Sequence, residues 1–184
     1  MHFNEHWELK GKHAFLSPSN YHWLNYSSEK LASRWQAAQA VELGIKLHKF
    51  AEDAINLGVF LKGNSSTLAR YVNDAIYYKL TPEVILYYSQ NCFGTADAIR
   101  FDSSKGVLRI HDLKTGSVPA SFVQLEIYAA LFCLEYGVDP ARIQIALRIY
   151  QGDDVVEETP DASLIQSIMD NIVTKDSELN ELRG

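Results

Sequence analysis

Two aspartates and a lysine stand at the ends of two short apolar segments of this chain. Asp97 stands near the start of the first segment. Asp112, fifteen residues after it, and Lys114 stand at the end of the second segment. Carboxylate oxygens are the ligands that hard divalent cations prefer. An ammonium group beside such a cation can stabilise the negative charge that develops during hydrolysis. These residue types therefore indicate metal-assisted hydrolysis, provided that the fold brings them together.

The residues between the aspartates predict a β-hairpin that would bring them together. A tight turn centred on Ser104 and Lys105 separates strands that we expect over residues 96–102 and 107–114. In this register the two aspartates lie opposite one another. Side chains alternate along a strand, so one face of the hairpin collects an apolar series that ends in charged residues. That face is predicted to hold Asp97, Ile99, Phe101, Leu108, Ile110, Asp112 and Lys114.

Like charges placed opposite one another on a sheet repel, and a bound cation would relieve the repulsion. Simpler interpretations remain open, because Asp97 could merely end a strand and Asp112 could pair with Lys114 or Arg109. Arg100 and Arg109 are expected to face one another on the opposite side of the hairpin. Solvent, acidic partners on a covering helix or backbone phosphates could accommodate them there.

A helix expected over residues 41–57 carries a second candidate pair. At helical spacing one face combines polar and apolar residues: Val41, Ile45, His48, Glu52 and Ile55. Neutral imidazole and carboxylate are ordinary divalent-metal ligands, and a buried glutamate needs a partner. The alternative is that His48 is a core residue with its hydrogen bonds satisfied.

The helix after the hairpin places Gln124 and Tyr128 on one face, close to the loop that leaves Lys114. They could hydrogen-bond a phosphate or hold the lysine. The alternative is an ordinary helix surface with one buried tyrosine.

The positioning elements around these residues predict an α/β fold with a central mixed β-sheet flanked by helices. We expect a single domain over 1–184, with a mainly helical part (1–80), a sheet with a central helix (81–160) and a C-terminal helix (161–184). The expected elements are a long helix over 29–56, broken near 41–44, a helix from Ser65 or Ser66 to about 79, a strand over 83–89, the hairpin, a helix over 120–136, strands over 142–150 and 155–158, and a helix capped by Asp161.

Composition limits the function classes. The net charge of -6 argues against a protein that coats nucleic acid with a broad basic surface, although an enzyme with a narrow acidic metal site remains compatible with it. Two cysteines are too few for a disulfide framework, and no apolar run has membrane-spanning length. We therefore expect no membrane association and a cytoplasmic location.

Four segments, in this order, resemble the PD-(D/E)XK nuclease superfamily, in particular its RecB-type and phage-exonuclease branch. The resemblance runs from about Ser17 to Gly137. Its segments are Gly44-Ile45-Lys46-Leu47-His48 with Glu52, Gly94-Thr95-Ala96-Asp97, Asp112-Leu113-Lys114-Thr115-Gly116, and Gln124-Leu125-Glu126-Ile127-Tyr128.

The resemblance implies a restriction-endonuclease-like core and a bound Mg²⁺ or Mn²⁺. The ligands that it implies are Asp97, Asp112, the Leu113 backbone carbonyl and His48. It also implies that Lys114 positions or deprotonates the attacking water. The remaining site residues would have supporting roles: Gln124 and Tyr128 beside the lysine and the nucleic acid, and Glu52 behind the metal or on a second one.

The function expected from this resemblance is a metal-dependent deoxyribonuclease, an exonuclease rather than an endonuclease, that acts on DNA in recombination, repair or phage DNA processing. The resemblance also implies a recombination protein as a partner and a prokaryotic cell or a phage-infected host as the setting. Two rival hypotheses remain open at this stage. One is a non-catalytic nucleic-acid- or protein-binding module on the same fold, and the other is a nuclease that acts on RNA.

Overall fold

The computed structural model describes residues 4–63 and 66–183. They group into two compact units, 1–43 and 44–184. The first unit contains the 3-10 helices η1 (Trp7–Leu9) and η2 (Pro18–Asn25) and the beginning of the helix α1 (Ser28–Leu57). Within it, Phe15 and Trp35 make an edge-to-face ring contact at 5.0 Å. The single-domain prediction stays a prediction.

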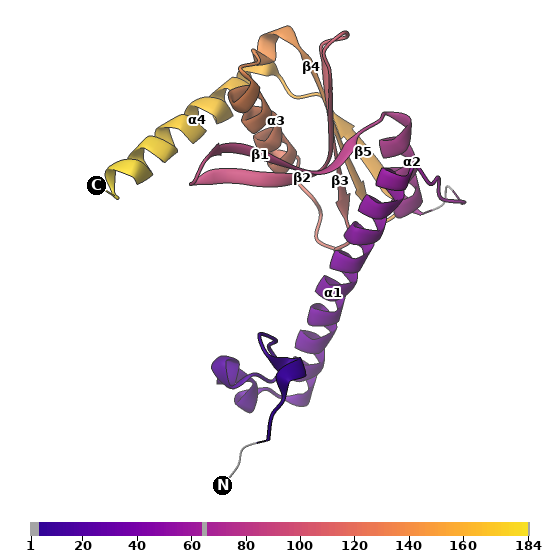
Figure 1. Cartoon of the computed structure of the whole chain (residues 1–184), viewed down its shortest axis with the longest axis vertical. Helices are drawn as coiled ribbons and strands as arrows, with labels where there is room; N and C mark the ends of the chain where they lie inside the picture. Colours follow the sequence, from indigo (N-terminus) through magenta and orange to yellow (C-terminus); the bar gives the residue numbers. More distant parts are fainter. Residues whose placement is uncertain (1–3, 64–65, 184) are drawn as a thin grey trace. The chain divides into compact units, whose positions relative to one another are not determined.

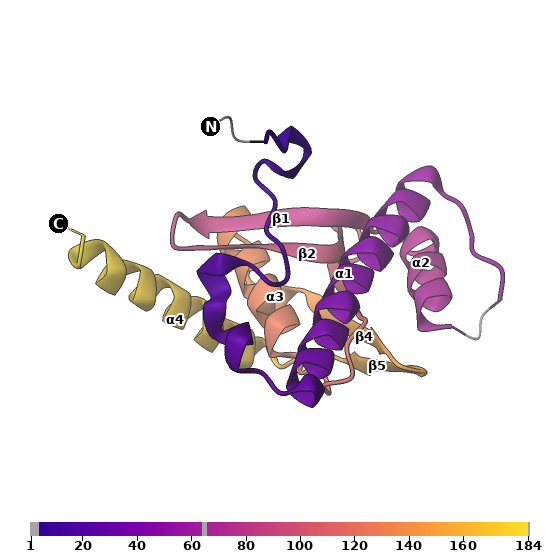
Figure 2. The same cartoon turned by 90° about the horizontal axis from the view of Figure 1, so that it is seen from below.

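The second unit is built on a five-stranded mixed sheet in the order β1-β2-β3-β4-β5. All neighbouring strands are antiparallel except the parallel pair β3 and β4, which the helix α3 connects. The elements are α2 (Thr67–Tyr77), β1 (Thr81–Ser89), β2 (Cys92–Asp102), β3 (Val107–Lys114), α3 (Val123–Tyr136), η3 (Pro140–Arg142), β4 (Gln144–Gln151), β5 (Asp154–Glu158) and α4 (Ala162–Glu181). Figure 2 shows β1 and β2 as long neighbouring ribbons.

Helices cover both faces of this sheet (Figure 1). On one face α3 and α4 pack on the strands through residues such as Leu125 and Ile165, both fully buried. On the other face the end of α1 and the helix α2 pack through Ala51 and Val72. The predicted α/β class with a mixed sheet between helices is confirmed, and it agrees with a restriction-endonuclease-like core. No described helix combines the length and the apolar character that a membrane span requires.

The hairpin of β2 and β3 has the predicted register from its turn to the pair of Ala98 and His111, whereas the predicted pairing of Asp97 with Asp112 stays a prediction. Asp102 pairs with Val107, and Ile99 pairs with Ile110, as the turn chemistry requires. The second strand has the predicted bounds. The first begins at Cys92, four residues earlier than expected, because β1 pairs with it down to Ser89 through a tight turn.

The other element boundaries agree with the sequence within a few residues. Ser66 caps α2 by accepting a hydrogen bond from the Ala69 amide, whereas Ser65 lies outside the described residues. The helix α3 begins three residues later than predicted and ends at Gly137, whose φ of 63° is the left-handed geometry of a C-terminal glycine. The fourth strand begins two residues late because Pro140–Arg142 forms a 3-10 turn.

Strand alternation is interrupted in β2 at Asp97. Ala96 belongs to the core beneath α3, whereas Ala98, two residues on, belongs to the core beneath α2. Regular alternation would have placed both on one face. The neighbouring position on β1 is Glu83, a non-glycine residue with a left-handed φ of 52°. The side chains of β2 therefore do not alternate regularly on either side of Asp97. The prediction of unbroken alternation along this strand is wrong there.

The helix α1 is continuous over 30 residues, so the predicted break near residues 41–44 is wrong. The predicted apolar face is also wrong in part, because Ile45 is 66% exposed and Val41 is exposed as well. The buried residues of this helix are mostly small: Gly44, Ala51, Ala54 and Ile55. Small residues let the helix axis approach the sheet closely, which brings the half-buried His48 toward the strands.

A buried polar network lies between α2 and the strands β3 and β4. The Tyr150 hydroxyl donates to Asp74 over 2.7 Å and lies 3.1 Å from His111 Nδ1. Arg148 donates to the same Asp74 oxygen over 2.9 Å. Burial, with the positive charges of Arg148 and Arg109, lowers the pKa of His111 to about 3. This histidine therefore stays neutral in the native protein.

We expect acid to destabilise the wild type more than the variant His111→Gln. The unfolded histidine takes up a proton below its usual pKa of 6.5, whereas the buried one, with a pKa of about 3, does not. Its contribution to stability is complete above about pH 6.5 and is lost as the pH falls toward 3. Between about pH 7.5 and pH 5 the difference in unfolding free energy between the two proteins should shrink by about 2 kcal/mol.

Urea unfolding in EDTA at these two pH values measures this difference, and the contributions of other titrating groups cancel in the comparison. The control is His13→Gln, because His13 is exposed. Equal pH responses of the wild type and His111→Gln would contradict the expectation.

Candidate functional site

Asp97 lies where three elements meet. Its Oδ2 atom accepts a hydrogen bond from the backbone amide of Leu113 in β3 over 2.9 Å. The same oxygen lies 3.5 Å from Nδ1 of His48 in α1. Burial, and then repulsion by Asp112, raise the pKa of Asp97 to about 6, although the Leu113 amide and His48 act in the opposite direction. The two aspartates are thus close enough for each charge to disfavour the other.

Asp112 is the most buried carboxylate of the site, with a side chain only 2% exposed. Lys114 Nζ lies 3.1 Å from its Oδ1 atom in a hydrogen bond and 3.0 Å from its Oδ2 atom. The second contact is an ion pair without hydrogen-bond geometry, because Oδ2 has no hydrogen-bond partner among the described residues. A buried carboxylate oxygen with no donor is costly. It is the kind of atom that a metal ion would satisfy.

Lys114 is held from its other side by α3. Its ammonium donates to Gln124 Oε1 over 2.7 Å, and the amide of Gln124 donates to the Tyr128 hydroxyl over 3.1 Å. The Tyr128 ring lies against Gly94, where an added Cβ atom would stand 3.0 Å from the ring. Gln124 and Tyr128 therefore form a chain of contacts that fixes the lysine beside Asp112.

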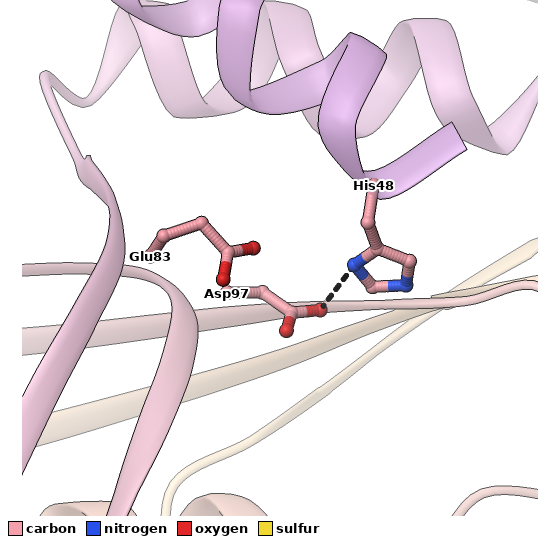
Figure 3. A group of neighbouring side chains, drawn as sticks. All are labelled: His48, Glu83 and Asp97. Atoms are coloured by element: carbon pink, nitrogen blue, oxygen red, sulfur yellow. Dashed lines mark ion pairs between the residues drawn. The ribbon is translucent and has the colours of Figure 1, made fainter. Parts of the chain in front are cut away.

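Glu83 is the residue that the sequence interpretation missed. One ligand atom each of His48, Glu83 and Asp97 lie within 4.8 Å of one another, which makes these residues a candidate metal group (Figure 3). Burial raises the pKa of Glu83, and His48 acts in the opposite direction. The sequence predicts Glu83 only as the first residue of a strand, because its position opposite Asp97 depends on the β1–β2 register. Its left-handed φ has no sequence signature in a glutamate.

The position of His48 depends on a close approach of α1 to the loop that follows Lys114. A Cβ atom on Gly44, one helical turn before His48, would stand 2.8 Å from Oγ1 of Thr115. Only glycine leaves this space at its present size. Gly44 therefore allows α1 to lie close to the loop, and His48 then points to Asp97 (Figure 3).

The contacts of two predicted site residues differ from the predicted ones. Glu52 forms an ion pair with Lys49 at 3.0 Å and is not part of the His48, Glu83 and Asp97 group, although its charge helps to raise the pKa of Glu83. Leu113 is buried, and its backbone amide donates a hydrogen bond to Asp97. A ligand role for its carbonyl remains a prediction.

The donor set fits a hard divalent cation. The group of His48, Glu83 and Asp97 offers two carboxylates and one imidazole, which are ligand types that Mg²⁺ and Mn²⁺ accept, and Asp112 is not a member of this group. Asp97 is the residue common to the sequence-predicted set with Asp112 and to the group with His48 and Glu83. The raised pKa of Asp97 indicates negative charge that the protein alone leaves poorly compensated, and Asp112 Oδ2 has no hydrogen-bond partner among the described residues.

We expect Mn²⁺ to stabilise the protein at about pH 7.5 and much less at about pH 5. Asp97, with a pKa of about 6, is largely protonated at the lower pH, and the metal must then displace a proton. Saturation at a hundred times the dissociation constant adds about 2.7 kcal/mol, which corresponds to a rise in Tm of about 5–10 °C.

Thermal unfolding with EDTA or with Mn²⁺ at both pH values measures this effect. Asp170→Asn is the matched control, because Asp170 lies exposed on α4, and it should keep the shift. An absent shift at the higher pH, or equal shifts at both, would contradict metal binding at Asp97.

Comparisons with known proteins leave the family of this chain open. No protein family model matches it, and no curated protein matches it in sequence. A solved structure described as "Crystal structure of SSO0001" is similar over 84% of this chain and 68% of that chain, at 16% identity and a TM-score of 0.36. A likeness of this size bears on neither the activity nor the ligands of the chain.

Proposed function

We propose that this protein is a metal-dependent nuclease that hydrolyses phosphodiester bonds in DNA, with Asp97, Asp112 and Lys114 at the centre of its site. One observation carries the proposal. The Lys114 ammonium is fixed by Gln124 at 2.7 Å and by Asp112 at 3.0–3.1 Å, beside a second buried carboxylate that Asp112 repels. The resemblance of the four sequence segments to the PD-(D/E)XK superfamily supports the same function.

The metal site that we propose uses Asp97 and Asp112, with His48 and Glu83 as further ligands. When bound, Mg²⁺ or Mn²⁺ supplies Lewis-acid activation of the scissile phosphate and makes a water nucleophilic at neutral pH. His48 would hold the ion through an imidazole nitrogen. The Leu113 amide keeps the Asp97 carboxylate oriented in the absence of other partners.

Lys114 contacts two partners, Asp112 and Gln124. The Asp112 oxygens that hold its ammonium would also hold the metal ion, and Lys114 would then be available to the substrate. Gln124 would keep the ammonium near the same place, because it binds the lysine independently of Asp112. The lysine then neutralises the charge that develops on the phosphate. Tyr128 orients Gln124 and is a positioning residue.

A cleavage assay tests the proposal. The full chain is incubated with linear and with circular duplex DNA, and with single strands, in Mg²⁺, Mn²⁺ or EDTA. We expect degradation that needs the metal and starts from the ends of linear molecules, because the branch that the motifs resemble contains phage exonucleases. Nicking of the circle would indicate an endonuclease. The absence of cleavage with either metal would reject the enzyme and leave the binding-module hypothesis.

A further inference from the structure

A basic hollow of about 450 Å³ lies between the end of α2 and the turn end of the β2–β3 hairpin. Four basic residues, two tyrosines and one acid supply its polar lining: Lys79, Arg100, Lys105, Arg109, Tyr77, Tyr78 and Asp102. Four cations against one carboxylate is a local excess of positive charge in a chain whose net charge is -6. Neither the proposed nuclease site nor the sheet core accounts for it.

The two arginines of this lining place like charges opposite one another. Arg100 and Arg109 are directly opposite one another in the hairpin register, so their Cβ atoms lie about 5 Å apart. Both side chains are half-buried. Among the described residues neither arginine forms an ion pair. Of the two lysines in the lining, Lys105 forms an ion pair with Asp102, at 4.0 Å.

Neutral groups hold the arginines in place. Arg100 donates one hydrogen bond to the backbone carbonyl of Lys79 over 3.2 Å, and the guanidinium of Arg109 lies over the Tyr78 ring at 4.4 Å. These contacts orient the guanidinium groups without cancelling their charge. An arginine has five N–H donors in a planar fork that matches the oxygens of a phosphate. Most of these donors therefore remain available to a ligand.

We propose that this hollow binds a phosphate group, carried by a nucleotide or by a nucleic-acid strand. Paired guanidiniums bind phosphate through parallel charge-assisted hydrogen bonds, and Lys79 and Lys105 add charge at the rim. The hollow has the size of ordinary small-ligand pockets, about 300–1,000 Å³. Tyr77, which is 73% exposed at its edge, offers a ring on which a base can stack.

The phosphate pocket is distinct from the proposed nuclease site. Arg109 stands three residues before Asp112 in β3, so alternation directs the two side chains to opposite faces of the sheet. The pocket lining has four basic residues against the single carboxylate of Asp102, so its ligand binds without a divalent cation. Binding in EDTA therefore tests the pocket whether or not the protein is a nuclease.

Isothermal titration of the full chain in EDTA tests the proposal, with pyrophosphate, adenosine triphosphate and a twelve-nucleotide single strand as the probes. We expect pyrophosphate to bind, and its affinity to fall at least tenfold in the double variant Arg100→Gln/Arg109→Gln. The control Arg142→Gln, an exposed arginine in η3, should bind as the wild type does. Tighter binding of the triphosphate than of the strand assigns the pocket to a nucleotide. Tighter binding of the strand, with displacement of pyrophosphate, assigns it to nucleic acid.

A second variant protects the test against misfolding of the first. Lys79→Gln/Lys105→Gln changes two exposed side chains and leaves the arginine contacts with the Lys79 carbonyl and the Tyr78 ring in place. It should weaken pyrophosphate binding at least threefold. Failure of the wild type to bind pyrophosphate, or undiminished binding by the folded variants, would overturn the proposal.

Discussion

Replacement of Asp97 by asparagine should make the protein more stable and at the same time inactive. The pKa of this carboxyl is about 6, against an ordinary value of 3.8, because it is buried and Asp112 repels its charge. For an acid with a raised pKa the cost of ionisation is absent below about pH 4, grows as the pH rises to 6, and is complete above it. At about pH 7.5 in EDTA we expect Asp97→Asn to gain about 1–3 kcal/mol of unfolding free energy.

Asparagine retains an oxygen that can accept the Leu113 amide, so the variant keeps the main local hydrogen bond. It loses the charge that a divalent cation needs, and cleavage in Mg²⁺ should fall by about a thousandfold or more. Urea unfolding in EDTA and a cleavage assay in Mg²⁺ measure the two effects. The same substitution at the exposed Asp170 should change neither. An Asp97→Asn protein that is less stable, or that still cleaves, would contradict our account.

The second large effect is expected for Lys114→Met, which removes the ammonium and keeps a side chain of similar length. We expect the turnover rate to fall by about 10²–10⁴, the usual contribution of a positioned proton-transfer or charge-stabilising group. Stabilisation by Mn²⁺ should persist or increase, because Asp112 loses the lysine with which it forms an ion pair and keeps an oxygen that has no hydrogen-bond partner among the described residues.

Two separate measurements identify the role of the lysine. Thermal unfolding with Mn²⁺ reports the metal site, and single-turnover cleavage reports the chemical step. Lys175→Met is the matched control, since Lys175 is exposed on α4 and pairs with Glu178. Simultaneous loss of metal stabilisation and cleavage would mean that Lys114 maintains the structure of the site, and unchanged cleavage would remove it from the mechanism.

Local chemistry made much of the fold predictable. The turn around Ser104 and Lys105 sets the register of the hairpin, so the pairing of Ile99 with Ile110 follows from residues close in sequence. The glycine after α3 and the serine before α2 likewise act within one helical turn. Gln124 is also close to Lys114 in sequence, so the sequence could predict that the two residues lie near one another.

The errors concern features that depend on distant parts of the chain. Periodicity assigned Ile45 to the buried face of α1, but the close approach of this helix to Thr115 selects small residues such as Gly44 and Ala51 instead. Glu83 was missed because it reaches Asp97 only through the β1–β2 register and an unusual backbone conformation. Helix-packing distance and cross-strand position are tertiary properties, and residue types within a window do not specify them.

The most direct test of the central claim is a side-by-side cleavage assay of the wild type and Asp112→Asn on end-labelled linear duplex and single-stranded DNA, in Mg²⁺ and in EDTA. We predict metal-dependent degradation by the wild type and none by the variant, because Asp112 anchors Lys114 and is a ligand of the metal in the site that we propose. Cleavage by Asp112→Asn at the wild-type rate, or an inactive wild type with both Mg²⁺ and Mn²⁺, would contradict the claim.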